Sequence, residues 1–237
     1  VLGQRPYVDD IRVEGMLHAA LRLSDHPRAR VLSIDTTAAE QVAGVVRVFT
    51  APDVPGQRSV GLIQQDWPLF VAVGEETRYI GDVLAAVAAE SEAIARQAVE
   101  LIRVEYEVLE PLTDPFEALK PDAPLIHATH ATGNILATTV VKRGDLAAAR
   151  AASAYLSADR YETQRIEHGY MEPEASIAYP ADDGITVLSQ SQGIYEDRMQ
   201  LAKLLGVEEA QVRVILVPNG GGFGGKEDLE VQGHAAA

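Results

Sequence analysis

Five glycines and one phenylalanine stand close together in the stretch NGGGFGGKE, at positions 219–227 of this 237-residue chain. The spacing of Gly220, Gly222 and Gly225 fits the G-x-G-x-x-G pattern of dinucleotide-binding loops. Gly220, Gly225 and Lys226 also fit the first seven positions of a phosphate-binding loop, G-x-x-x-x-G-K. Both patterns place backbone N–H groups around an anion, so this loop is the first place to look for a binding site.

Each pattern lacks a part that its chemistry requires. A phosphate-binding loop follows its lysine with Ser or Thr, whose hydroxyl binds Mg²⁺, but position 227 is Glu. A dinucleotide-binding loop needs a following helix and an acidic residue ~20 positions on, which the sequence does not supply. A turn without a ligand needs only one or two glycines, since each costs ~0.5–1 kcal/mol relative to Ala in ordinary backbone. Five glycines favour exposed consecutive amides, as in an anion-binding nest, with Phe223 shielding them from water.

Strands and helices alternate along the chain, and one strand leads directly into the glycine loop. Apolar runs and alternating patterns predict strands at 16–23, 45–50, 82–90, 104–111, 175–180, 184–191 and 212–218. Apolar residues at helical spacing predict helices at 91–103, 144–153 and 195–206, the last closed by Gly206. Thr37 and Glu40 have the spacing of a capping box, which predicts a further short helix there. The stretch 52–66 is loop-like, and the class is α/β (α+β).

A stretch rich in proline divides the chain. Three prolines and a glycine recur between short apolar groups at 114–135, which predicts a connection between two domains. We therefore expect a first domain at 1–115, a linker at 116–135 and a second domain at 136–237.

The composition excludes several classes of function. The formal net charge of −15 at pH 7 repels the phosphates of nucleic acids and anionic membranes. The absence of cysteine excludes disulfides, iron–sulfur ligation and a cysteine nucleophile in this chain. No run approaches the ~20 apolar residues of a membrane span, and no signal peptide is visible, so a cytoplasmic location is expected. The first residue, Val1, suggests a fragment or one subunit of a split protein.

A resemblance to a known family accounts for the loop. GGGFGGKE at 220–227 resembles the molybdenum-site loop of the xanthine dehydrogenase/aldehyde oxidase family of molybdenum hydroxylases. The similarity extends to the family's a/b hammerhead domain through YVDDI at 7–11, LHAALRLSDHPRARVLSIDT at 17–36, GVVRVFTAPDVPG at 44–56 and YIGDVLAAVAAES at 79–91. GDLAAARAAS at 144–153, EHGYMEPEASIA at 167–178 and SQGIYEDRMQLAKLLGV at 191–207 resemble the opening of its molybdopterin-binding domain. The resemblance implies a hammerhead domain at 1–115 and the N-terminal part of a molybdopterin-binding domain at 136–237.

The resemblance also implies roles for individual residues. Gln192 would donate its side-chain amide to an oxo ligand of a molybdenum–molybdopterin cofactor, although alone it could be a solvated residue at a helix N-terminus. Gly222, Phe223 and Gly224 would contact the metal's ligands through the backbone. Glu227 matches the residue that faces purine substrates, although alone it could complement a helix dipole. The general-base glutamate of the family lies toward its C-terminus, so no catalytic residue is expected in this chain.

The implied reaction is the oxidative hydroxylation of a purine-like N-heterocycle or an aldehyde, with water as the oxygen source. Electrons would leave through 2Fe-2S clusters to FAD, held on partner chains or domains of an oligomeric complex. The VPN before the glycines departs from the basic residue and methionine usual in xanthine dehydrogenases, which leaves the substrate open. Without cysteine to bridge molybdenum to copper, carbon-monoxide dehydrogenase chemistry is disfavoured. The alternative is a non-catalytic structural module that serves the assembly of the flavin and iron–sulfur subunits.

Other polar groups carry weaker signals. His127 and His130 supply two ligands, where a catalytic zinc site needs three from the protein. His168 is either a member of a hydrogen-bonded pair near the cofactor or a core histidine, and the second is favoured. Glu172 and Glu174 lack a partner at a defined distance, so they are not expected to form an acid/base pair.

Overall fold

The computed structural model describes residues 4–128 and 130–237, which form two compact units. The first unit extends to Pro111 and resumes at His168, and the second is Leu112–Glu167. Sequences on both sides of the proline-rich stretch thus share one unit, while the domain boundaries at 115 and 135 remain predictions. Within the described ranges, no helix is both long and apolar enough to cross a membrane.

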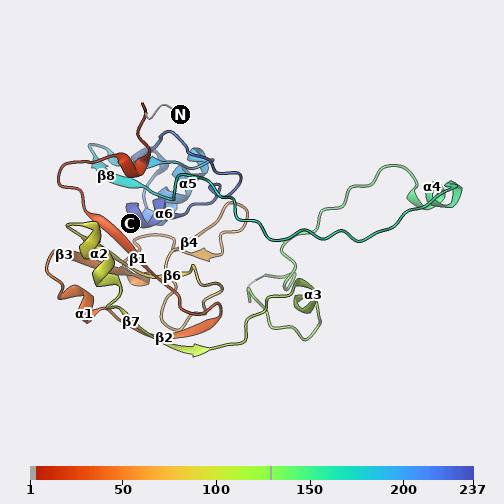
Figure 1. Cartoon of the computed structure of the whole chain (residues 1–237), viewed down its shortest axis with the longest axis horizontal. Coiled ribbons are helices and arrows are strands. Elements are labelled where there is room, and N and C mark those ends of the chain that lie inside the picture. Colours follow the sequence, from red (N-terminus) through yellow and green to blue (C-terminus); the bar gives the residue numbers. More distant parts are fainter. Residues whose placement is uncertain (1–3, 129) are drawn as a thin grey trace. The chain divides into compact units, whose positions relative to one another are not determined.

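An antiparallel sheet of three strands organises the N-terminal half of the first unit (Figure 1). Its strands are, in spatial order, β1 (His18–Leu23), β6 (Val83–Ala89) and β3 (Val45–Thr50). The central strand β6 has the sequence VLAAVAA and is almost entirely buried, as expected of a strand covered on both faces. Helix α2 (Glu92–Val99) packs on β1 and β6, and the Oγ of Ser91 caps it by accepting from the N–H of Ile94 at 3.3 Å.

A second, two-stranded antiparallel sheet pairs β2 (Ala29–Asp35) with β7 (Arg103–Val108). The first strand was not predicted from the sequence, because HPRARVLSID interrupts its apolar residues with arginines. In the structure Ala29 and Val31 point into the core and the arginines lie outside. Smaller elements complete this half, namely α1 (Thr37–Glu40), β4 (Ser59–Val60), β5 (Trp67–Pro68) and the 3-10 turns η1 (Val8–Asp10) and η2 (Ala51–Asp53).

The C-terminal half contains a mixed sheet in the order β10-β9-β8. Strands β8 (Ile177–Ala181) and β9 (Gly184–Ser189) lie at two of the predicted strand positions and form an antiparallel hairpin. Strand β10 (Val212–Leu216) pairs parallel to β9, with Leu216 opposite Ser189. A parallel pair requires a crossover connection, and helix α5 (Ile194–Leu205) provides it. The carboxyl ends of β9 and β10 therefore lie side by side at one edge of the sheet.

The two halves of the first unit share a hydrophobic core and backbone hydrogen bonds. Phe70 of the N-terminal half packs in one cluster with Leu201 and Leu204 of α5. The N–H of Gly56 donates to the carbonyl of Leu204 at 2.8 Å, and that of Gln57 to the carbonyl of Lys203 at 2.8 Å. These bonds provide donors to carbonyls in the last turn of α5, where the Lys203 carbonyl also accepts from the N–H of Gly206 at 3.2 Å.

Helix α5 ends at the residue that the sequence predicted. Gly206 has φ 68°, the left-handed conformation predicted for the residue that closes this helix. A 3-10 turn, η3 (Glu209–Gln211), then leads into β10, and a final helix, α6 (Val231–Ala236), packs against α5. That last helix was not predicted, because VQGHAA is short and contains a glycine.

The second unit has little regular structure. It contains α3 (Pro115–Ala118), capped by Asp114, and α4 (Leu146–Ala152), capped by Asp145. Helix α4 confirms the prediction at 144–153, and the chain reaches it and returns through extended segments (Figure 1).

The contact of Gly56 with α5 gives a prediction about stability. A Cβ at this position would lie 2.3 Å from the carbonyl oxygen of Lys203 and 2.5 Å from the nitrogen of Gly206, both backbone atoms. We expect Gly56→Ala to lower the free energy of unfolding, measured by urea titration, by ~2 kcal/mol or more. The control is Gly74→Ala, where the Cβ meets nothing within 4 Å and only the φ of +90° opposes it, at ~1 kcal/mol. Equal losses in the two variants would contradict the proposed clash.

Candidate functional site

Two segments that follow neighbouring parallel strands meet at the edge of the C-terminal sheet. The segment Gln190–Gln192 follows β9, and the glycine loop at 219–227 follows β10. The N–H of Val217 donates to the carbonyl of Ser189 at 3.0 Å, which continues the strand pairing beyond β10. The N–H of Gln192 then donates to the carbonyl of Lys226 at 2.8 Å. Ligands bind preferentially at the carboxyl ends of parallel strands, so this edge is the candidate site.

The side chain of Gln192 lies against the loop. Its Oε1 accepts from the N–H of Gly224 at 2.9 Å and from that of Lys226 at 3.4 Å. A Cβ at Gly222 would lie 2.3 Å from the same Oε1, so any larger residue here would displace the Gln192 amide. The structure thus places Gln192 beside the residues that flank Phe223, as the sequence predicted. With Oε1 occupied, Nε2 is the remaining polar atom, and it donates to no protein group in the described ranges.

The tip of the loop is a tight turn with an unusual backbone. The N–H of Gly225 donates to the carbonyl of Gly222 at 2.8 Å. The two residues between them, Phe223 and Gly224, have φ of 53° and 91°, as in a type I′ turn. Phe223 is the one non-glycine residue with positive φ in the described part of the chain, a conformation that costs an L-residue ~1–2 kcal/mol. Phe223 is 75% exposed, and its ring lies against Gly221, where an added Cβ would meet it at 3.1 Å.

The remaining amides of the loop can be counted one by one. The N–H of Gly220 donates to Glu172 Oε2 at 2.7 Å, and that of Gly221 to Asn219 Oδ1 at 2.7 Å. Gln192 and the turn occupy the amides at 224–226. Within the described ranges, the N–H groups at 219, 222, 223 and 227 donate to no protein acceptor, and among these four only those of 222 and 223 are adjacent. Backbone N–H groups need partners, so these two are available to a ligand.

A buried ion pair supports the loop from beneath. Lys226 Nζ donates to the carbonyl of Glu172 at 2.9 Å and approaches its Oε2 at 3.3 Å. The two side chains are 0% and 2% exposed, and the ammonium also lies 4.5 Å from the ring centre of Tyr170. No local pattern in the sequence indicated this pair, because its members are 54 positions apart and each has an ordinary local setting.

A second buried carboxyl group lies in the first turns of α5. Asp197 is fully buried, and its Oδ2 accepts from the Oγ of Ser189 at 2.9 Å. Gln232 Nε2 donates to the same Ser189 oxygen at 3.2 Å, which ties α6 to the end of β9. Burial, opposed by the serine hydrogen bonds and reinforced by the nearby charge of Glu196, raises the pKa of Asp197 to about 6.

The other polar residues noted in the sequence occupy different settings. Glu227 is exposed on the loop beside Lys226. His168 is also exposed and stacks near Tyr170 with ring centres 6.3 Å apart, so the interpretation as a core histidine is wrong. Glu174 accepts from the hydroxyl of Tyr170 at 3.0 Å and from Gln190 Nε2 at 3.1 Å, which makes it a structural acceptor.

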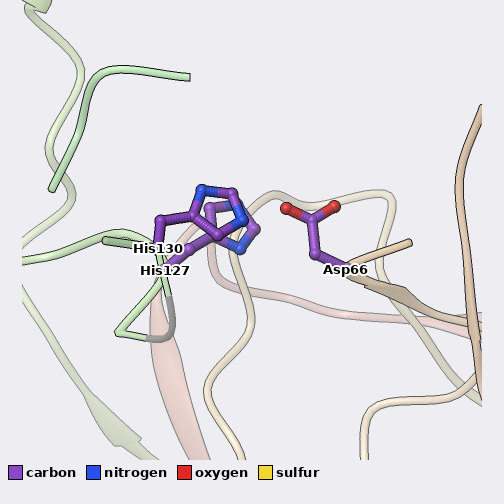
Figure 2. Close-up of side chains that lie close together, drawn as sticks. All are labelled: Asp66, His127 and His130. Carbon is purple, nitrogen blue, oxygen red and sulfur yellow. The ribbon is translucent and has the colours of Figure 1, made fainter. Parts of the chain in front are cut away.

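His127 and His130 lie together in the second unit, as Figure 2 shows. Their rings are nearly parallel, with centres 4.7 Å apart. Among the described residues of the second unit, no further histidine or carboxylate completes a cluster of metal ligands with them.

The buried carboxyl of Asp197 gives a prediction about pH. Its pKa is raised from an ordinary 3.8, so the folded state favours the protonated form, and this contribution to stability is lost as pH rises through about 6. Since one pKa unit corresponds to ~1.4 kcal/mol, ionisation destabilises the fold by ~2–3 kcal/mol above pH 6. The difference in the free energy of unfolding between Asp197→Asn and the native chain should therefore shift by that amount in favour of the variant as the pH is raised from 4 to 8. Urea unfolding across this range measures it, and a difference independent of pH would contradict it.

Comparison with known proteins identifies the family. Residues 2–110 match the family described as aldehyde oxidase and xanthine dehydrogenase, a/b hammerhead domain, and residues 126–237 match the molybdopterin cofactor-binding domain. Over its whole length the chain is 40% identical to a probable xanthine dehydrogenase subunit from Bacillus subtilis, and the match covers 31% of that relative's length. It is also 35% identical to the nicotinate dehydrogenase large molybdopterin subunit of Eubacterium barkeri, and that match covers 55% of the relative's length. The chain therefore spans 31% of the first relative's length and 55% of the second's.

The solved structures agree with the sequence matches. The solved structure of the aldehyde oxidoreductase from Desulfovibrio gigas superposes on 99% of this chain with a TM-score of 0.88, at 28% identity and over 27% of its own length. The hammerhead and molybdopterin matches follow one another in the order that the sequence resemblance implied. The chain belongs to the xanthine dehydrogenase/aldehyde oxidase family of molybdenum hydroxylases, with a hammerhead domain followed by sequence of the molybdopterin cofactor-binding domain.

Proposed function

We propose that this chain is the molybdopterin-binding part of a molybdenum hydroxylase that oxidises a nitrogen heterocycle, with water as the oxygen source. One observation carries the proposal. Gln192 and the glycine loop meet at the carboxyl ends of β9 and β10, and each carries N–H donors that have no protein acceptor among the described residues.

The donors present fit a cofactor rich in oxygen ligands. Gln192 Nε2 and the N–H groups of Gly222 and Phe223 are donors without protein acceptors among the described residues, and such groups stabilise negative oxygen atoms. Gly224 was also expected to contact the cofactor, but its N–H is engaged by Gln192 Oε1. We therefore assign the backbone contact to residues 222 and 223. When bound, the molybdenum–molybdopterin cofactor supplies the redox chemistry, and this chain positions it.

A nitrogen heterocycle is the substrate class that the loop and the relatives favour. Glu227 presents an exposed carboxylate directly after the loop, and a carboxylate accepts hydrogen bonds from ring N–H groups. The two curated relatives, at 40% and 35% identity, are named for xanthine and nicotinate, both heterocycles. The aldehyde oxidoreductase is less similar, at 28% identity.

Electron transfer requires components that this sequence lacks. Without cysteine, the described chain cannot ligate an iron–sulfur cluster. The relatives are named as subunits, so we propose that 2Fe-2S and FAD components belong to partner chains or domains of the same complex.

The donor role of Gln192 can be separated from its acceptor role. In Gln192→Glu, a carboxylate oxygen still accepts from Gly224 and Lys226, but the Nε2 donor is lost. We expect the complete enzyme with this change to retain molybdenum, measured by elemental analysis, while kcat falls ~100-fold. Gln192→Leu removes both roles and should lower the molybdenum content as well. Native kcat in Gln192→Glu would show that the donor is not used.

Glu227 provides the test of substrate class. We expect Glu227→Val in the complete enzyme to lower kcat/KM for a purine ~10–100-fold, because a hydrogen-bonded ring loses its acceptor, while aldehyde turnover is spared. Glu209→Val, which removes an exposed carboxylate beyond the other end of α5, is the control. Equal losses on both substrates would assign Glu227 to the fold, and no loss on either would remove it from the substrate site.

A further inference from the structure

We propose that Glu172 and Lys226 are a positioning pair that holds both ends of the glycine loop and so decides which of its N–H groups face the cofactor. This inference rests on the proposed function and adds two residues to it. The side chains are 2% and 0% exposed, so neither can touch a substrate. Their action must pass through the loop and Gln192.

Glu172 is in contact with both ends of the loop at once. Its Oε2 accepts from the N–H of Gly220 at 2.7 Å and lies 3.3 Å from Lys226 Nζ. A Cβ at Gly220 would lie 2.5 Å from the Cβ of Glu172, so the loop packs directly on this side chain. One carboxylate oxygen thus fixes the span between positions 220 and 226.

Lys226 connects that carboxylate to Gln192. Its ammonium is held by Glu172 and by the ring of Tyr170, while its backbone bonds to Gln192 in both directions. The carbonyl of Lys226 accepts from the N–H of Gln192 at 2.8 Å, and its N–H donates to Gln192 Oε1 at 3.4 Å. A shift of the ammonium therefore moves the acceptor that Gln192 relies on, and the Nε2 donor moves with it.

Stability alone is a poor explanation for the pair. Desolvation of two charges consumes most of their attraction, so apolar residues of similar size often serve a core as well or better. Glu172 Oε1 is buried and makes no hydrogen bond to a described residue, so the pair is not the most stable arrangement even of its own atoms. The pair instead sets the orientation of the loop, because its hydrogen bonds fix Gly220, Lys226 and, through the backbone, Gln192.

The test uses the complete, cofactor-loaded enzyme and two variants. Glu172→Asp keeps the charge pair but is one CH₂ shorter, so it cannot reach Gly220 and Lys226 together. The double variant Glu172→Gln/Lys226→Met removes both charges and leaves no buried ion unpaired. Lys203→Met, an exposed lysine on α5, is the matched control. The measurements are Tm, molybdenum per chain, kcat, KM and the Mo(V) electron paramagnetic resonance signal.

We expect both pair variants to keep Tm within a few degrees of the native enzyme, with kcat reduced at least tenfold and KM changed less than threefold. Their Mo(V) signal should differ from the native one, because displaced donors alter the surroundings of the metal. Lys203→Met should leave every measurement unchanged.

Native kcat and a native Mo(V) signal in Glu172→Asp and in the double variant would overturn the proposal. A second outcome would also overturn the proposal: kcat falls only in proportion to the loss of Tm, and the remaining molybdenum gives the native Mo(V) signal. The pair would then have a purely structural role. A native enzyme without molybdenum would contradict the proposed function itself, so the two failures are distinguishable. Glu172→Asp retains its ion pair, which keeps the test decisive if the double variant does not fold.

Discussion

The parallel pairing of β9 with β10 is the constraint on which the candidate site depends. Parallel neighbours end at the same edge of a sheet, and helix α5 must cross over between them. Gln192 therefore leaves β9 beside the place where the glycine loop leaves β10, although Gln192 and Gly224 are 32 positions apart. An antiparallel connection would have sent the two segments to opposite edges.

Hydrogen-bond satisfaction then shapes the loop. Several consecutive glycine amides cannot all remain without partners next to a buried core, and the chain supplies acceptors from Glu172, Asn219 and Gln192. Together they accept from the N–H groups of 220, 221, 224 and 226, and the adjacent N–H groups at the centre of the loop, those of 222 and 223, are left as donors. Phe223 adopts a left-handed backbone there, a strain that the surrounding bonds must hold in place.

The N-terminal half contributes by supporting the helix between the two strands. Its loop at Gly56 satisfies carbonyls at the end of α5, and the N–H of Gly61 donates to Gln200 Oε1 at 2.7 Å on the same helix. Phe70 and Leu201 share one core cluster. The orientation of α5, and with it the position of Gln192 at its start, is thus set by residues far away in the sequence.

Local signals in the sequence determined the elements whose stability is local. The apolar run of β6, the periodicity of α5, the left-handed Gly206 and the positions of strands β8 and β9 were all predicted, because propensity and turn chemistry act over a few residues. The glycine spacing located the loop, and the family resemblance added Gln192. Only the tertiary structure decided the pairing of β2 with β7, the ion pair beneath the loop and the set of free amides. Each of these joins residues distant in the chain, and burial there leaves no local pattern from which a partner could be deduced.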